Sequence, residues 1–322
     1  MDLSVRVIGT VFIDCKGFAR QKYHPEGRNL GDIEFVHGGV GRNVAENLVN
    51  FDLPVTLVSS VDDNALGVEV VDRLKEINLN TSLILKAEKN GMGMWLALIN
   101  ESGDLVGSIS KMPDLTSLEE FINKNGEELV ASSSHIVLEL DLTSRITRKV
   151  VELSNKMNKP VYGIPGNLEI VMENLDILPM LECFICNDFE AGKIIGIDLT
   201  GLECGQVKWL LAKHFFVEGK RSRYTVVTLG SEGSIYHDAI SDSVKYMPAL
   251  PTEVIDTSGA GDAYFSGTVL GLIQGLPLEQ AVACGTRVAS WTISSLQSIC
   301  PDLKDKVREE KFRLPGLNHP GD

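Results

Sequence analysis

The stretch EVIDTSGAGDAYFSG, residues 253–267, combines a turn of small residues with an acid. The small residues 259–261 stand directly before Asp262, and an apolar run follows them. Thr257 and Ser258 are good helix N-cap residues, so we expect a buried helix to begin here, after a strand that ends at EVID. The N–H groups at a helix N-terminus bind anions, and small side chains let a phosphate approach them. The stretch therefore predicts an anion site with a carboxylate beside it.

Asp262 itself has two interpretations. A carboxylate in the first turn of a helix complements the helix dipole, which is a purely structural role. A carboxylate beside an anion site can also accept the proton of a substrate hydroxyl while the turn holds a phosphoryl group. Such general-base help contributes roughly 10²–10⁴ in rate, and the electrostatic clamp usually contributes more. The four residues 259–262 alone leave the two interpretations equal.

The rest of the chain alternates between two kinds of segment. LSVRVIGTVFID, residues 3–14, is a β-branched run that ends at Asp14, as expected of a buried strand whose carboxyl end opens onto a site. Similar runs occupy residues 55–61, 135–141, 160–165, 183–188 and 224–230. Helical patterns lie between them, at residues 40–51, 67–77, 144–157 and 202–215. This alternation predicts a parallel sheet covered by helices on both faces.

Two segments interrupt the alternation. Residues 16–36 are polar and contain glycine, and residues 91–110 hold two extended runs joined by a Ser-Gly-Asp turn, which predicts a hairpin. We expect both to form a small β-lid over the strand ends, where open α/β sheets bind their ligands. The predicted division is a core of residues 1–14, 37–90 and 111–310, a lid of residues 15–36 and 91–110, and a tail of residues 311–322.

Composition excludes several classes of function. The formal net charge of −14 over 322 residues repels polyphosphate, which argues against general binding of nucleic acid or of an anionic membrane. A phosphorylated ligand must therefore be held locally, by backbone N–H groups or a metal ion. No apolar run reaches the roughly 18 residues of a membrane span, so we expect a cytoplasmic protein. The six scattered cysteines are expected to be reduced, with the CFIC pair on a buried strand.

Two motifs resemble signatures of a known family. DTSGAGDAYFSG at residues 256–267 and GGVGRNVAENL at residues 38–48 are similar to the C-terminal and N-terminal signatures of the ribokinase-like, or PfkB, sugar and nucleoside kinases. Val44 replaces the last glycine of a G-x-G-x-x-G fingerprint, so a dinucleotide site is excluded. The resemblance spans about residues 5–305. It implies a three-layer α/β/α core with a mostly parallel sheet, a small β-lid, and ATP-dependent phosphorylation of a hydroxymethyl group.

The resemblance also implies roles on the acceptor side. Asp262 would be the catalytic base, and the anion hole would be formed by Gly259, Ala260 and Gly261. The sugar would be held by Asp14, Gly38, Gly39, Gly41, Asn43 and Asp141. For Gly38, Gly39 and Gly41, the structural alternative is a plain turn before a helix.

On the donor side, NDFE at residues 187–190 matches the N-x-x-E element of the family. Asn187 and Glu190 would organise Mg²⁺ and the phosphates of ATP, with Glu190 acting on the metal largely through water. A helix cap is the structural alternative. The resemblance also implies that the nucleotide is contacted by Thr228, Gly230, Asp256 and Thr257. Relatives with this Asp-Thr pair often respond to K⁺, and the response of this chain stays open.

The chain also departs from the family pattern. Ribokinases often carry lysine where this chain has Val40, which argues against ribose, and many relatives carry an acid where it has Gly163. Several stretches are similar to pseudouridine kinases, which implies the 5′-hydroxyl of pseudouridine as acceptor. A ribokinase or fructokinase type, another nucleoside kinase, and a catalytically silent nucleoside-binding sensor are the alternatives. A homodimer that pairs through the exposed lid strands is a further hypothesis.

Overall fold

The structure, a computed structural model, describes residues 2–87, 89–140, 142–166, 168–217 and 219–309. Within these residues a nine-stranded sheet runs through the core in the order β13-β12-β11-β10-β9-β8-β1-β4-β5. The strands are parallel from β11 to β5, and β12 and β13 are added antiparallel at one edge. Their bounds are β1 Val5–Ile8, β4 Val55–Asp62, β5 Asn80–Ala87, β8 His135–Glu139, β9 Val161–Ile164, β10 Cys183–Asn187, β11 Tyr224–Thr228, β12 Ser234–Asp238 and β13 Ser243–Met247.

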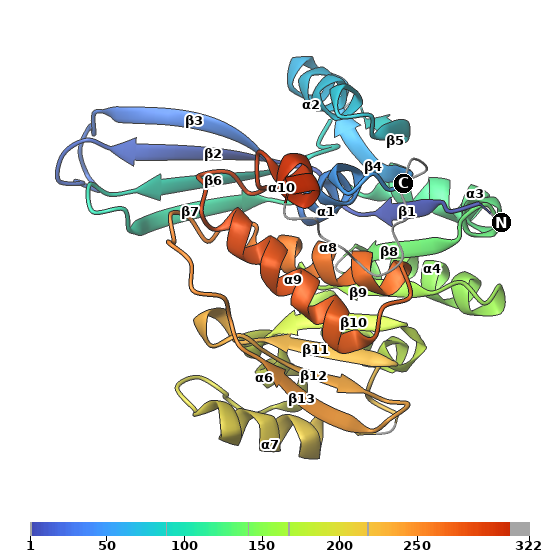
Figure 1. Ribbon diagram of the computed structural model, residues 1–322. Coiled ribbons are helices and arrows are strands. Elements are labelled where there is room, and N and C mark those ends of the chain that lie inside the picture. Colours follow the sequence, from blue (N-terminus) through green and yellow to red (C-terminus); the bar gives the residue numbers. More distant parts are fainter. Residues whose placement is uncertain (1, 88, 141, 167, 218, 310–322) are drawn as a thin grey trace.

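A second, four-stranded sheet projects from one end of the core (Figure 1). Its order is β3-β2-β6-β7, with β2 at Phe12–Ala19, β3 at Gly31–Gly38, β6 at Gly93–Ile99 and β7 at Leu105–Lys111. β6 and β7 pair antiparallel, so the hairpin predicted within residues 91–110 is confirmed. We call these four strands the small sheet.

Helices cover both faces of the large sheet. One apolar cluster joins the sheet to α1 (Val40–Asn50), α2 (Ala65–Glu76), α8 (Ala260–Ile273), α9 (Leu278–Thr292) and α10 (Leu303–Glu309). A second cluster joins its other face to α3 (Thr116–Ala131), α4 (Ser144–Lys156), α5 (Leu168–Glu173), η1 (Leu175–Met180), α6 (Asp188–Ile195) and α7 (Cys204–His214). The predicted three-layer α/β/α core is confirmed. None of the helices in the described ranges combines the length and the apolar character that a membrane span requires.

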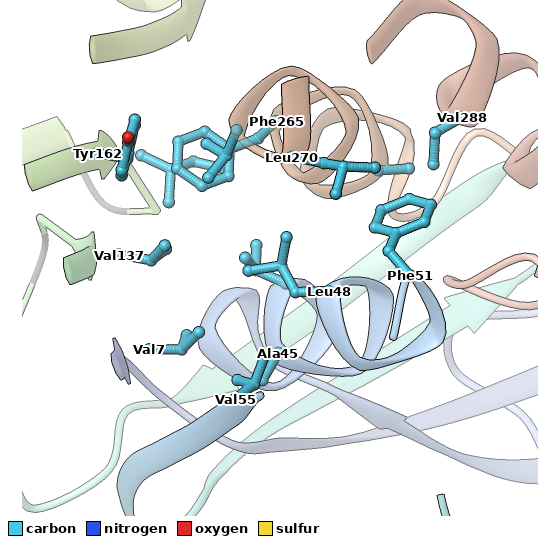
Figure 2. Close-up of a cluster of buried hydrophobic side chains, with 14 of the residues drawn as sticks. Val7, Ala45, Leu48, Phe51, Val55, Val137, Tyr162, Phe265, Leu270 and Val288 are labelled. Atoms are coloured by element: carbon cyan, nitrogen blue, oxygen red, sulfur yellow. The ribbon is translucent and has the colours of Figure 1, made fainter. Parts of the chain in front are cut away.

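The α1–α8 contact fixes the two helices that carry the family signatures. Figure 2 shows Leu48 of α1 pointing toward Phe265 and Leu270 of α8, with Val7 and Val137 of the sheet beside them. All five side chains are at most 1% exposed. Burying side chains of this size contributes about 1.5–3 kcal/mol each. The N-terminal ends of both helices are therefore held in a constant relation to each other.

The prediction of one strand over residues 3–14 is wrong. The run divides at Gly9 into β1 of the large sheet and β2 of the small sheet, so Asp14 lies within β2 rather than at the end of the first core strand. An apolar run has the same composition in either sheet, and only the pairing partners distinguish them. The EVID segment is also not a strand, since residues 248–258 contain no regular element.

The other sequence features lie as follows. Cys183 and Cys186 are buried free thiols on β10, which confirms the structural interpretation of CFIC. Gly163 lies inside the buried strand β9, where a Cβ atom would come within 2.9 Å of the side chains of Leu140 and Leu181. A side chain at this position would require the leucine side chains to shift.

Candidate active site

The turn before Asp262 forms the start of a helix, as predicted, although its cap differs from the predicted one. α8 begins after Gly259, whose φ of 75° is left-handed, and neither Thr257 nor Ser258 is the N-cap. A Cβ atom on Gly259 would overlap the carbonyl oxygen of Ser298, so only glycine fits there. The next glycine, Gly261, has open space where a Cβ would lie, and it lines a cavity.

Asp262 lies in the first turn of α8 and is partly buried. Its Oδ2 accepts a hydrogen bond of 2.7 Å from Asn43 Nδ2, on the N-terminal turn of α1. Loss of hydration raises the pKa of Asp262 to about 7, and the charges of Glu139 and Asp14 act in the same direction, against the Asn43 hydrogen bond and Arg42. A base with this pKa is half ionised near neutral pH, which suits proton transfer.

Asn43 offers a second polar atom to the site. Its Oδ1 is buried and has no hydrogen-bond partner in the described part of the chain. A buried amide oxygen without a partner is costly, by about 1–3 kcal/mol. A bound hydroxyl group would satisfy it.

Asp14 approaches the same place from the small sheet. Burial raises the pKa of its carboxyl group, against the charges of Lys16 and Arg42. A Cβ atom on Gly38 would lie 2.6 Å from Asp14 Oδ2, so the absent side chain makes room for this carboxylate. Gly39, with φ of 98°, turns the chain from β3 into α1.

Glu139, at the end of β8, is a site residue that the sequence did not indicate. Its Oε2 accepts from the backbone N–H groups of Thr10 at 2.6 Å and of Gly41 at 3.0 Å, and its Oε1 accepts from Thr10 Oγ1 at 2.8 Å. Asp141, the acid predicted to contact the sugar, lies outside the described residues.

Arg42 holds the backbone of the glycine turn in place. It is a second residue that the sequence did not indicate. It is 3% exposed, pairs with Glu46 at 2.6 Å, and donates to the carbonyl oxygens of His37 and Gly38. A buried arginine needs such partners, because an unpaired buried charge is strongly destabilising. Its signal in the sequence was an i, i+4 Arg-Glu pair on an otherwise apolar helix face.

A cavity of about 550 Å³ lies on the other side of the α8 turn. It is lined by three of the six residues predicted to bind the nucleotide and by two residues of the turn, namely Thr228, Gly230, Thr257, Ala260 and Gly261. Tyr264 of α8 and Thr286 of α9 also line it. The residues predicted to bind the phosphoryl donor, ATP, therefore meet those predicted to bind the phosphoryl acceptor at the turn 259–261.

Asn187 and Glu190 form a capping box at the start of α6. Asn187 Oδ1 accepts from the Glu190 N–H, and Glu190 Oε2 accepts from the Asn187 N–H, both at 2.8 Å. Neither residue lines the cavity, but Asn187 is the register partner of Thr228 across β10 and β11. Burial raises the pKa of Glu190. Among the described residues no cluster of three or more metal-ligating side chains occurs.

Asp256 is also in the site, beside a cation that the sequence did not single out. Its Oδ2 lies 3.5 Å from Nζ of Lys16 on β2, and its Oδ1 accepts from the Ser258 N–H. The pKa of Asp256 is lowered: its burial acts to raise it, but the Ser258 hydrogen bonds and Lys16 together outweigh this. The Lys16 side chain is 9% exposed.

Comparison with known proteins agrees with this arrangement. The family profile described as pfkB family carbohydrate kinase matches residues 2–305. The chain is 34% identical over 306 residues to a guanosine-inosine kinase of Exiguobacterium acetylicum, covering 94% of this chain and 99% of that protein. It is 26% identical over 300 residues to the pseudouridine kinase of Escherichia coli K12, covering 93% of each.

A solved structure shares the fold. The Arabidopsis thaliana ribokinase complexed with ribose and ATP superposes with a TM-score of 0.78 at 19% identity, over 96% of this chain and 98% of that one. The profile match and the 34% identity, both over nearly the whole length, decide the family. The chain belongs to the pfkB family of carbohydrate kinases and is a phosphotransferase.

Proposed function

We propose that the protein transfers the γ-phosphoryl group of ATP to the 5′-hydroxyl of a nucleoside, with guanosine or inosine as the preferred acceptor. The observation that carries the reaction is the Asn43–Asp262 hydrogen bond at the anion-binding turn. The named relative at 34% identity supports the purine nucleoside. Pseudouridine, which the sequence motifs favoured, is the second candidate, supported by the relative at 26% identity.

On the acceptor side, Asp262 accepts the proton of the attacking hydroxyl. Asn43 occupies Oδ2 of this carboxylate, which leaves Oδ1 for the substrate. Asp14 and the free Oδ1 of Asn43 hold hydroxyl groups of the sugar, because a carboxylate can accept from two adjacent hydroxyls. The absent side chains of Gly38, Gly39 and Gly41 make room for Asp14 and for the backbone of residues 9–12, which lets these segments pack closely at the site. Glu139 is already bonded to backbone donors and positions the turn.

On the donor side, the 550 Å³ cavity takes the nucleotide. Thr228, Gly230 and Thr257 contact it, and the N–H groups of Gly259 and Gly261 stabilise the charge of the phosphoryl group in transfer, while the Ala260 N–H donates to the carbonyl oxygen of Thr257. ATP as donor is supported by the kinase family and by the ribokinase fold neighbour that holds ATP.

The residues present fit a magnesium ion held mainly through water. Glu190 keeps one carboxylate oxygen outside the capping box, and Mg²⁺ in such sites takes few protein ligands. When bound, the ion would neutralise charge on the phosphates. Asp256, whose pKa is lowered, is paired with Lys16 at 3.5 Å, so a monovalent cation such as K⁺ at this carboxylate would share it with that ammonium group.

We also propose that two copies associate through the small sheet. Cross-strand pairing places Ile33 and Phe35 of β3 on the same face as Ile109 of β7, and they are 70%, 62% and 68% exposed. Asp14 and Lys16 occupy the opposite face, toward the core. An exposed apolar sheet face of this kind marks an interaction site.

The test of the reaction is release of ADP from ATP and Mg²⁺, with guanosine, inosine, pseudouridine, adenosine, ribose and fructose offered separately. We expect turnover with guanosine and inosine. Turnover with pseudouridine alone would select the second candidate, and turnover with a free sugar would overturn the nucleoside proposal. Asp262→Asn tests the sensor alternative, since it should abolish turnover while leaving nucleoside binding intact.

A further inference from the structure

Lys16 is a buried cation on the face of the small sheet that looks toward the α8 turn. It stands two residues after Asp14 on β2, so both side chains leave the strand on the same face. Its ammonium group lies 3.5 Å from Asp256, three residues before the glycine turn. Few lysines are this well buried without a specific partner or task.

A cation at this place would stabilise the negative charge on the phosphoryl oxygens. The chain carries a net charge of −14, and it has no phosphate-loop lysine motif. Arg42 is engaged with Glu46 and with two backbone carbonyl groups. An ammonium group has three N–H donors, and a contact with Asp256 uses one of them. Two donors of Lys16 are therefore left for a ligand at the turn.

We propose that Lys16 donates to the phosphoryl group in transfer and is a catalytic residue; this rests on the proposed kinase reaction at Asp262. In the step, the bond from the γ-phosphorus to its bridging oxygen breaks, and that electron pair leaves with ADP. The bond from the acceptor oxygen to phosphorus forms, and the hydroxyl proton passes to Asp262. Lys16 stays protonated and stabilises charge on the oxygens of the moving group.

A simpler role for Lys16 would be to tie the small sheet to the core through Asp256. The two roles differ in what they affect. If Lys16 only links the small sheet to the core, its loss would weaken the affinity for every ligand that the small sheet covers, the nucleoside included. A phosphoryl contact would act only where a γ-phosphate is present, so it would leave ADP and nucleoside affinity unchanged.

The experiment compares Lys16→Met and Lys16→Arg with the wild type. Lys75→Met is the matched control, since Lys75 pairs with Asp72 at 2.9 Å on the surface of α2. Turnover is measured with guanosine and ATP. Calorimetry gives the dissociation constants of guanosine, of ADP and of the non-hydrolysable β,γ-imido analogue of ATP, each with Mg²⁺.

We expect Lys16→Met to lower kcat about 10²-fold, as removal of one charge-stabilising donor does. It should weaken the ATP analogue about tenfold and change ADP and guanosine affinity less than twofold. Lys16→Arg should restore kcat to within about tenfold, and Lys75→Met should match the wild type. Equal weakening of all three ligands, or unchanged kcat in Lys16→Met, would overturn the proposal. A wild type without turnover on any acceptor would refute the proposed function instead.

Discussion

Asn43 and Asp262, 219 positions apart in the chain, share a 2.7 Å hydrogen bond that joins the N-terminal turns of α1 and α8. The two signature motifs thus meet at one carboxylate. The helices behind them are packed together through Leu48 and Phe265, so the bond is held by the core.

The activity should follow the ionisation of Asp262. Because the pKa of Asp262 is raised to about 7, kcat/KM should fall about tenfold per pH unit below pH 7 and level off above it. Asn43→Ala removes a bond that lowers this pKa, so the inflection should move to higher pH, with a loss of about 10–100-fold in kcat/KM. Asn47→Ala, one turn along α1 and without hydrogen-bond partners for its side chain in the described residues, is the control. A profile without inflection between pH 6 and 8 would refute the assignment of the base.

Glu139→Gln should move the same inflection the other way. The charge of Glu139 raises the pKa of Asp262, so its removal should shift the profile to lower pH. In glutamine, an NH₂ group that cannot accept replaces one of the carboxylate oxygens that accept from Thr10 and Gly41. We therefore expect a loss of about 1–3 kcal/mol in the free energy of unfolding. Chemical denaturation and a pH–rate profile measure the two effects, with Glu119→Gln on α3 as the control. A shift to higher pH would contradict the electrostatic argument.

Gly41→Ala should destabilise the protein. The added Cβ would lie 2.6 Å from the Cα of Gly9, where the chain leaves the large sheet. Overpacking of this kind costs about 1–3 kcal/mol. Gly205→Ala, in α7 with nothing within 4 Å of the new Cβ, should be neutral or stabilising by up to about 1 kcal/mol. Thermal unfolding of both variants tests this. Equal melting temperatures would contradict the prediction and show that the backbone at Gly9 can shift without cost.

The small sheet should control association. Sedimentation at micromolar concentration should find a dimer in the wild type and a monomer in the double variant Ile33→Asp, Phe35→Asp, because charges would be buried at the interface. Ile240→Asp, at an equally exposed isoleucine between β12 and β13, should remain dimeric. A wild type that sediments as a monomer would remove this proposal.

The sequence was sufficient for the α/β/α core and for the hairpin of the small sheet, because periodicity and turn chemistry act locally. It failed at residues 3–14, where one apolar run serves two sheets, since pairing partners are not local. It also placed the helix cap at Thr257 and Ser258, while the close contact of Gly259 with Ser298 puts the start of α8 one residue later.

The site residues divide in the same way. Asp262 and Asn43 lie in motifs with strong local signals. Glu139 and Lys16 do not, and Arg42 lies in such a motif without being singled out by it. The importance of all three comes from neighbours that only the tertiary fold supplies. A buried charge cannot be recognised in a sequence without knowing what surrounds it.

The separation of the two sheets has an evolutionary consequence. The proposed proton acceptor, Asp262, and the proposed anion-binding turn before it lie at the start of α8, which is anchored in the core, whereas Asp14 and the strands around it belong to the projecting sheet (Figure 1). Mutations in β2, β3, β6 and β7 that spare Lys16 can therefore alter which acceptor is chosen while residues 256–262 are inherited unchanged. Descendants of one ancestral enzyme could diversify in this way without reinventing the chemistry.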